Sequence, residues 1–207
     1  MKIKVCGMKD AENIKEVTAL GPDYMGFIFY ERSPRYCGGM APAVVKGLPD
    51  NVKPVMVSVD MTEDEIMRIA ERYGFGIVQL HGHELPELCF SLRSRGLKVV
   101  KAAGMRSASN LDILREYGGA VDAFLLDTLC AAKGGSGRKF DWSILDAYDL
   151  PEDFYLSGGI GPQDVESVKQ LHHPRFVGID LNSRFETSPG IKDVDMLRKF
   201  INEIKTA

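Results

Sequence analysis

The 207-residue sequence predicts an α/β protein, a compact single-domain (β/α)8 TIM barrel that spans residues 1–207. Short apolar runs alternate with helical patterns eight times, at about 26 residues a unit, and such alternation implies right-handed parallel crossovers. Most runs are continuous, as in parallel strands that are buried on both faces. Eight units favour a closed barrel over an open sheet. Because such barrels usually take ~250 residues, we expect one or two outer helices to be short.

Eight candidate strands follow from the apolar runs and the turn residues between them. They span residues 2–6, 24–29, 54–59, 77–80, 98–102, 123–127, 154–157 and 176–180. No linker, low-complexity tract or break in composition separates these strands, so we expect no second domain.

Helical patterns and caps lie between the strands. Asp10 can cap a first helix, Thr62 with Glu65 forms a capping box, and Pro162 suits a first helical position. An apolar stripe of period 3.6 over residues 196–204 predicts the last helix. Further helical patterns cover residues 41–48, 84–95, 107–117 and 141–147.

Composition argues against several classes of protein. Apolar residues make up 44% and charged residues 27%, which is ordinary for a globular protein, and the net charge is −3. A slightly acidic balance without a basic block argues against nucleic acid as the main partner. No apolar run is long enough to span a membrane, and the first residues lack the apolar segment of a signal peptide. We therefore expect a cytoplasmic protein without a membrane partner, a monomer or a homodimer.

The four cysteines, at positions 6, 37, 89 and 130, have no metal-binding spacing. None forms Cys-x-x-Cys, and His81 stands alone, so we expect no metal site. In a reducing cytoplasm each cysteine is either a small buried hydrophobic residue, the commoner case, or a reactive thiol.

Polar residues that follow the strands are the candidates for chemistry, because such barrels place the active site at the C-terminal strand ends. Cys6 and Asp127, on distant strands, could flank a substrate as base and acid. Arg35 could pair bidentately with a carboxylate. Taken singly, Cys6 would be a core thiol, Asp127 a cap or loop ligand and Arg35 an exposed arginine. The full set is Cys6, Arg32, Arg35, Asp60, Gln79, His81, Lys101, Asp127, Ser157, Gly158, Gly159, Asp180, Asn182 and Ser183.

Two turns of small residues predict a phosphate site. Gly158 and Gly159 follow the seventh strand, and Asn182 and Ser183 follow the eighth. Backbone N–H groups in such turns can converge on a dianion, and barrels commonly bind phosphate at this place. Either turn alone would favour a tight turn with positive φ, whereas the pair favours phosphate. A third small-residue segment, residues 134–137, suits a lid, a substrate-contacting loop or a linker.

Six motifs form an ordered set along the chain. They are Lys4-Val5-Cys6-Gly7; Gly26-Phe27-Ile28-Phe29 with Ser33-Pro34-Arg35-Tyr36; Val78-Gln79-Leu80-His81-Gly82; Leu126-Asp127-Thr128 with Gly134-Gly135-Ser136-Gly137 and Phe140-Asp141-Trp142; Leu156-Ser157-Gly158-Gly159; and Gly178-Ile179-Asp180-Leu181-Asn182-Ser183 with Glu186, Pro189-Gly190 and Lys192-Asp193. This set resembles the phosphoribosylanthranilate isomerase family of tryptophan biosynthesis. Each motif is weak by itself, but the ordered set covers essentially the whole chain and is specific.

The resemblance implies a cofactor-free Amadori rearrangement of N-(5-phosphoribosyl)anthranilate to 1-(2-carboxyphenylamino)-1-deoxyribulose 5-phosphate. Asp127 matches the family's general acid, which protonates the furanose ring oxygen, and Cys6 matches the base, which takes the C2′ proton. Arg35 matches the residue that holds the anthranilate carboxylate. The partner is then a small phosphorylated substrate, and the expected substrate-binding residues are Arg35, His81, Gly158, Gly159, Asp180, Asn182 and Ser183.

The residue types suit this chemistry. A cysteine, with an ordinary pKa of about 8.5, needs only a modest lowering of its pKa to act as a base near neutral pH. Asp127 must stay partly protonated, which calls for an apolar wall or the negative charges of the substrate. Two positions depart from the family pattern: Met8-Lys9 follow the first motif, and Arg184 stands where glycine is usual. A loop built for glycine would need a positive φ at Arg184.

Three alternatives remain. A histidine-pathway isomerase would be expected to use aspartates on both the first and the sixth strand, whereas this chain has Cys6 on the first. Indole-glycerol-phosphate synthase would carry catalytic lysines and a longer N-terminus; Lys101 stands at the fifth strand end, but the first strand begins at residue 2. A catalytically silent phosphate-binding barrel would be expected to lack Cys6 or Asp127.

Overall fold

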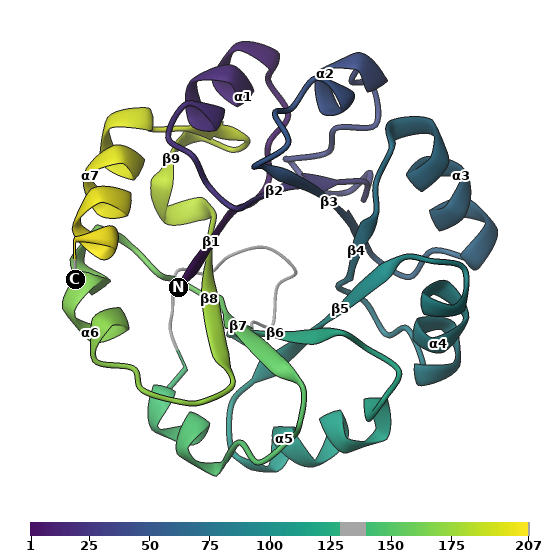
Figure 1. Ribbon diagram of the computed structural model, residues 1–207, viewed down its shortest axis with the longest axis vertical. Coiled ribbons are helices and arrows are strands. Elements are labelled where there is room, and N and C mark those ends of the chain that lie inside the picture. The colour runs from purple at the N-terminus through teal and green to yellow at the C-terminus, as the bar shows by residue number, and fades with distance from the viewer. Residues whose placement is uncertain (129–139, 207) are drawn as a thin grey trace.

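Eight parallel strands close into a barrel in the computed structural model, which describes residues 1–128 and 140–206. Viewed down its axis, the strands form an inner ring in chain order (Figure 1). The ring closes because β1 pairs with β2 on one side and β8 on the other, so Lys4 lies opposite both Tyr24 and Asp180. The predicted barrel is therefore confirmed. Its strands are β1 (Lys2–Val5), β2 (Tyr24–Ile28), β3 (Lys53–Ser58), β4 (Ile77–Leu80), β5 (Lys98–Met105), β6 (Ala123–Thr128), β7 (Asp153–Leu156) and β8 (Phe176–Leu181).

A ring of helices surrounds the strands (Figure 1), and α2, α5 and α6 have only 5, 6 and 5 residues, so more helices are short than the one or two expected. Residues 141–147, expected as a helical pattern, form a 3-10 helix, and Pro162 begins another 3-10 turn that leads into α6. None of the described helices combines the length and the apolar character that crossing a membrane requires. The helices are α1 (Ala11–Thr18), α2 (Pro42–Lys46), α3 (Glu63–Tyr73), α4 (Pro86–Ser94), α5 (Ser109–Leu114), α6 (Val165–Lys169), α7 (Val194–Lys205) and the 3-10 helices η1 (Arg115–Tyr117), η2 (Trp142–Ala147), η3 (Pro162–Asp164) and η4 (Ser183–Phe185).

Side-chain caps begin the longer helices where the sequence predicts them. The Asp10 carboxylate accepts the N–H of Asn13 at the start of α1. At α3 the Thr62 hydroxyl accepts the N–H of Glu65, and the Glu65 carboxylate accepts the N–H of Thr62 in return. Each cap satisfies backbone donors that have no partner within the helix.

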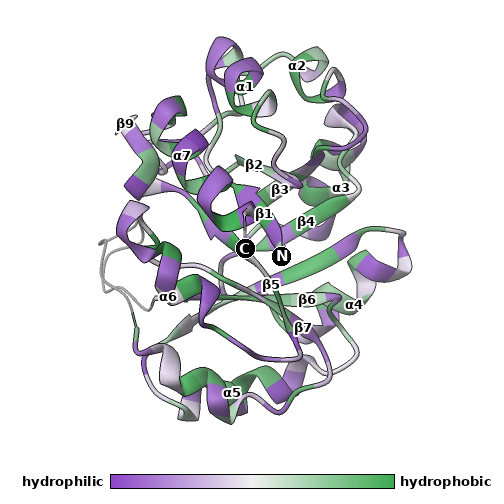
Figure 2. Cartoon of the chain, turned by 60° about the vertical axis from the view of Figure 1, so that its left-hand side comes forward, coloured by the Kyte–Doolittle hydropathy of each residue, from purple (hydrophilic) through white to green (hydrophobic). Residues whose placement is uncertain are grey.

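The apolar core lies between the barrel and its helices. On β1, Ile3 and Val5 belong to this core and are fully buried, whereas Lys4 and Cys6 face the inside of the barrel. Figure 2 shows strands that are mostly hydrophobic and helices in which hydrophobic and hydrophilic residues alternate. The strands are thus buried on both faces, as their continuous apolar runs predict, but the inner face carries charged and polar groups as well.

A short hairpin after β8 was not expected from the sequence. It consists of β9 (Glu186–Ser188) and β10 (Ile191–Lys192), which pair antiparallel. The side-chain amide of Asn13 fixes the hairpin to α1, because it donates to the Lys192 carbonyl at 3.0 Å and accepts the Lys192 N–H at 2.7 Å. The hairpin thereby positions the side chains of Glu186 and Lys192 close to the barrel mouth.

We expect Thr62→Ala to lower the free energy of unfolding by about 1 kcal/mol, because it removes the capping acceptor of α3. Thr62 is exposed and far from the barrel interior, so the rest of the fold is undisturbed. Urea unfolding followed by circular dichroism measures the change. Thr62→Ser keeps the hydroxyl and is the matched control, with nearly wild-type stability. Equal stability of the alanine variant would mean that the capping box contributes nothing.

Candidate active site

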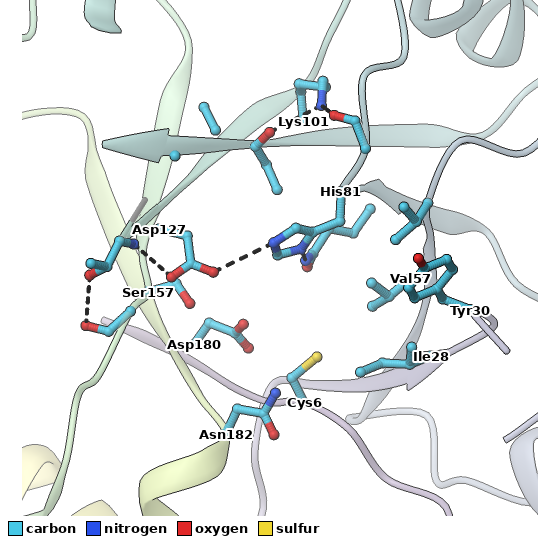
Figure 3. A pocket seen from close by; sticks show the side chains of 18 of the residues that line it. Cys6, Ile28, Tyr30, Val57, His81, Lys101, Asp127, Ser157, Asp180 and Asn182 are labelled. Carbon is cyan, nitrogen blue, oxygen red and sulfur yellow. Dashed lines mark hydrogen bonds and ion pairs between the residues drawn. The ribbon is translucent and has the colours of Figure 1, made fainter. Parts of the chain in front are cut away.

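A cavity of about 640 Å³ opens at the C-terminal ends of the barrel strands. Eight of the nine predicted site residues line this cavity. The ninth, Ser183, is not among the lining residues and begins η4. Figure 3 shows side chains from β1, β4, β6 and β8 converging on this space. The lining members of the predicted set are Cys6, Arg35, His81, Asp127, Gly158, Gly159, Asp180 and Asn182.

Cys6 directly follows β1 and is only 3% exposed. Its N–H donates to the carbonyl of Leu181, which extends the pairing of β1 with β8. Burial raises the pKa of the Cys6 thiol above its ordinary value, and the nearby Lys4 ammonium opposes this rise without overcoming it. The modest lowering of this pKa that a base near neutral pH needs is therefore not supplied by these surroundings, because desolvation of a thiolate outweighs the favourable charge.

Space for the thiol depends on a glycine in the neighbouring strand. A Cβ atom at Gly26 of β2 would lie 2.7 Å from the Cys6 sulfur and 3.1 Å from the Lys4 Nζ atom. Such approaches are too close for any side chain larger than hydrogen. Gly26 therefore leaves room for both the sulfur and the ammonium group.

Lys4 and Asp180 form an ion pair inside the barrel. The Lys4 Nζ atom lies 2.9 Å from Asp180 Oδ1, and both side chains are 5% exposed. Burial raises the pKa of Asp180. Burial alone would lower the pKa of Lys4, but the charges of Asp180 and Cys6 raise it above its ordinary value. Neither buried charge is left without a partner, which would cost several kcal/mol by itself.

Asp127 lies near the end of β6 and points into the cavity beside His81 (Figure 3). Its carboxylate accepts the N–H of Thr128 at 2.7 Å, and its Oδ2 atom is 3.5 Å from His81 Nε2. Gln79 Nε2 lies 2.9 Å from the other ring nitrogen of His81 and holds the ring in place. The surroundings of Asp127 are therefore polar, not the apolar wall that was one of the two conditions expected for a protonated acid.

Arg35 already binds a carboxylate within the chain. Its Nε atom donates to Glu186 at 2.9 Å and its Nη2 atom donates at 2.6 Å, in the bidentate geometry expected of it. Lys192 Nζ lies 2.6 Å from the same carboxylate, and these side chains are 12% exposed or less. Two cations share one anion, so the cluster of Arg35, Lys192 and Glu186 has an excess of positive charge.

The two predicted phosphate turns lie on the cavity wall. Gly158 and Gly159 both have positive φ, 85° and 74°, as a tight glycine turn requires. A Cβ atom at Gly158 would lie 2.3 Å from Thr128 Oγ1 and 2.7 Å from Asp127 Oδ1. This turn therefore packs directly against the end of β6, so a side chain at position 158 would displace Asp127 as well.

The loop after β8 tolerates its unusual arginine. Ser183, Arg184 and Phe185 form η4, and among the described non-glycine residues only Asp60 has a positive φ, of 52°. No left-handed conformation is needed at Arg184, so the expected conflict with a glycine position is absent. The Asn182 Oδ1 atom accepts a hydrogen bond from Lys192 at 2.8 Å. Residues 134–137, the third small-residue segment, lie outside the described residues.

The side chain of Lys101 is buried and binds groups of the β4–α4 loop. Its ammonium group donates to the carbonyls of Leu80 and Gly82 and lies 3.1 Å from a Glu84 carboxylate oxygen. Both members of this ion pair are 5% exposed or less. A lysine bound in this way holds the β4–α4 loop, which makes it a poor counterpart of a catalytic lysine.

Sequence reasoning quoted three further residues in its motifs, Lys4, Glu186 and Lys192, but gave them no role, although they organise the site. Lys4 had a usable signal, because it precedes Cys6 by two positions in a strand and must share its face. A lysine in an otherwise apolar strand also needs a buried partner. Glu186 and Lys192 stand in the sixth motif, but their pairing with each other and with Arg35 gave no signal, because it depends on a hairpin of two very short strands.

Within residues 1–128 and 140–206, the mouth of the barrel thus carries the thiol of Cys6, several carboxylates and the cationic cluster around Arg35. Among the described residues, no group of three or more His, Cys, Asp or Glu side chains is placed to hold a metal ion. The fold and this site define a (β/α)8-barrel enzyme whose cavity suits acid–base chemistry on an anionic ligand.

Comparison with known proteins identifies the family. A family model described as N-(5'-phosphoribosyl)anthranilate (PRA) isomerase matches residues 3–203. The chain is 46% identical over 206 residues to N-(5'-phosphoribosyl)anthranilate isomerase of Parabacteroides distasonis, which covers 99% of this chain and 93% of that protein. The phosphoribosyl anthranilate isomerase of Thermotoga maritima has a TM-score of 0.89 at 32% identity, with all of both chains covered. The corresponding structure from Thermus thermophilus has a TM-score of 0.87 at 28% identity, with 100% of this chain and 99% of that chain covered. The chain belongs to the PRA isomerase family.

We expect Glu186→Gln to destabilise the protein at pH 7 and to do so less as the pH falls. Burial alone would raise the pKa of Glu186, but Arg35 and Lys192 hold it below its ordinary value of 4.5. The ionised carboxylate therefore adds stability that is present above about pH 4.5 and is lost as the pH falls through the folded-state pKa.

Urea unfolding of the wild type and Glu186→Gln at pH 7 and at pH 4 or lower measures this difference. The gap between the two proteins should narrow at the lower pH. Glu203→Gln, at an exposed position on α7, is the control and should show no such gap. A gap that stays constant with pH would contradict an ionised Glu186 in the folded state.

Proposed function

We propose that this chain catalyses the Amadori rearrangement of N-(5-phosphoribosyl)anthranilate to 1-(2-carboxyphenylamino)-1-deoxyribulose 5-phosphate, with Cys6 as general base and Asp127 as general acid. The observation that carries the proposal is the placement of one thiol and one carboxyl on the same cavity, from β1 and β6, in a member of this family (Figure 3). No other cysteine of the described chain lines that cavity.

The acid acts first in this mechanism. Asp127 donates a proton to the furanose ring oxygen, the bond between C1′ and that oxygen breaks, and the anthranilate nitrogen becomes a protonated Schiff base. The iminium withdraws electrons from C2′ and makes its proton acidic. His81, 3.5 Å from Asp127 and held by Gln79, fixes the position from which the carboxyl acts.

The base acts second. The thiolate of Cys6 removes the C2′ proton, the electron pair moves into the C1′–C2′ bond, and the Schiff base becomes an enolamine. Tautomerisation of the enol at C2′ then gives the ketose. Burial raises the pKa of the Cys6 thiol, so the thiolate forms more readily when a positive charge lies nearby. The charged neighbours of Cys6 therefore affect the rate of proton removal.

The ends of the substrate are matched by different parts of the cavity. The positively charged cluster around Arg35 suits the anthranilate carboxylate, and the apolar side chains of Ile28, Tyr30 and Val57 suit the aromatic ring. The turns after β7 and β8 suit the phosphate, with backbone donors at Gly158 and Gly159. Ser183, which does not line the cavity, can contribute through its backbone at the start of η4.

A related structure supports this division of the cavity. A phosphoribosyl anthranilate isomerase with a TM-score of 0.85 and 31% identity to this chain was determined in complex with reduced 1-(o-carboxyphenylamino)-1-deoxyribulose 5-phosphate. That ligand carries both a carboxylate and a phosphate. The hydrogen bonds of Arg35 to Glu186 use Nε and Nη2, so the Nη1 edge is the one that a substrate carboxylate would meet.

We also propose that the enzyme works in the cytoplasm, as a monomer or a homodimer. A catalytic thiol and the buried free cysteines Cys37 and Cys89 suit a reducing compartment. The relative from Thermotoga maritima is described as dimeric, although monomers of it have been generated.

Conversion of freshly generated phosphoribosylanthranilate, followed by the loss of its fluorescence, tests the activity. We expect Cys6→Ser to lower kcat by ~10²–10⁴-fold, because a serine hydroxyl is a far weaker base than a thiolate. Binding of the reduced product analogue, measured by calorimetry, should stay nearly intact. Cys89→Ser changes a buried cysteine outside the cavity and is the matched control, with unchanged kcat. Wild-type kcat in Cys6→Ser would remove Cys6 from the mechanism.

We expect Asp127→Asn to be inactive for a different reason. Asparagine keeps the shape and can donate a hydrogen bond, but it cannot deliver a proton, so kcat should fall by ~10²–10⁴-fold. In a pH–rate profile, the limb that a carboxyl contributes should disappear from the residual activity. Near-wild-type kcat with an unchanged profile would show that another group supplies the proton.

A further inference from the structure

We propose that Lys4 is a positioning residue for the base: its ammonium group, held inside the barrel by Asp180, faces the Cys6 sulfur and stabilises the thiolate. This inference deepens the proposed function, on which it rests, because it assumes that Cys6 must ionise to work. It gives a role to Lys4, a buried cation that belongs neither to the phosphate turns nor to the Arg35 cluster.

The backbone brings the two side chains to one face. Lys4 lies on β1 and Cys6 directly follows it two positions later, where its N–H extends the pairing with β8, so both side chains point into the barrel. Gly26 on the adjacent strand is the common neighbour of both groups, because a Cβ atom there would lie 2.7 Å from the sulfur and 3.1 Å from Nζ. The absence of a side chain at position 26 leaves the space in which the ammonium group approaches the sulfur.

Asp180 sets where the ammonium group can be. It lies opposite Lys4 in the register of β8 against β1 and binds Nζ at 2.9 Å. At 5% exposure neither side chain can turn away into water. The ammonium group is therefore held between a carboxylate on one side and a thiol on the other.

The charges around Cys6 have opposing effects. Burial raises the pKa of the thiol most, Lys4 lowers it by charge and by a hydrogen bond, Asp180 raises it, and Lys192 from the hairpin lowers it. Cys37 also lies within electrostatic range, and His81 and Asp127 face the sulfur across the cavity (Figure 3). Since burial opposes ionisation, the thiolate can form only with a cation close by, and Lys4 is the nearest one on its own strand.

A purely structural role would look different. An ion pair that only fills the barrel would lose stability when either partner is replaced, and activity would fall in parallel at every pH. If the cation stabilises the thiolate, the two removals instead shift the ionisation of Cys6 in opposite directions. Removal of Lys4 raises the pH at which Cys6 ionises, and removal of the Asp180 charge lowers it.

The experiment is the pH dependence of alkylation of Cys6 by iodoacetamide, with the modified peptide quantified by mass spectrometry. This readout reports the thiolate directly and needs no isomerase activity. Asp180→Asn should shift the midpoint to lower pH, and Lys4→Met should shift it to higher pH, by ~1–3 units for loss of a cation at this range. Each unit lowers the thiolate fraction about tenfold below the midpoint, so kcat at neutral pH should fall by at least that factor in Lys4→Met.

A double variant guards against misfolding of Lys4→Met, which leaves Asp180 as an unpaired buried carboxylate. Lys4→Met combined with Asp180→Asn carries neither charge, and its midpoint should lie above that of Asp180→Asn alone by ~1 unit or more. Lys101→Met, which breaks the buried pair of Lys101 on β5 with Glu84, is the matched control and should leave the midpoint of Cys6 unchanged.

Equal midpoints in Asp180→Asn and the double variant would overturn the role of Lys4, and so would an equal shift in Lys101→Met. The proposed function fails separately, if the wild-type chain does not convert phosphoribosylanthranilate. If the alkylation midpoints shift as expected but the wild type is inactive, the proposed activity is refuted and the effect of Lys4 on Cys6 stands.

Discussion

A buried charge needs a partner, and this requirement shapes the mouth of the barrel. Three lysines of the described chain are nearly inaccessible, and each binds a carboxylate that is itself buried. Such pairs are costly to break because the remaining charge would be left without solvent. Lys4–Asp180 joins the first strand to the last, Lys101–Glu84 joins β5 to the loop after β4, and Lys192–Glu186 joins the two strands of the hairpin. The strand ends and loops around the cavity are therefore fixed by charge as well as by apolar packing. The pairs are Lys4–Asp180, Lys101–Glu84 and Lys192–Glu186.

The barrel could be predicted from sequence because its signals are local. Continuous apolar runs give each strand to within a few residues, and the caps at Asp10 and Thr62 begin their helices as predicted. The β9–β10 hairpin could not be predicted, because two strands of three and two residues have no periodicity to detect. What holds the hairpin is Asn13, a residue of α1 that is 179 positions away from its partner Lys192.

The site was predictable as a set of residues but not as a set of contacts. Topology alone brings the strand ends together, so Cys6 and Asp127 could be placed at one cavity from their positions in the chain. The environments of these groups depend on side-chain pairing across strands. The rise in the pKa of Cys6 comes from its burial, and the partner of Arg35 comes from the unexpected hairpin. Neither burial depth nor a long-range partner is encoded in local sequence spacing.

The same pairing makes the cavity selective for charge. Two cations share the carboxylate of Glu186, so this end of the cavity can accept one further anion without leaving a cation unpaired. At the base, Lys4 already has Asp180 as partner, and a thiolate there adds a negative charge to a balanced pair. In the proposed function the substrate carboxylate therefore binds at the Arg35 cluster and not at the Lys4–Asp180 pair, whose charges are already balanced. In the proposed mechanism the ammonium group of Lys4 then stays available to Cys6 when the C2′ proton is removed.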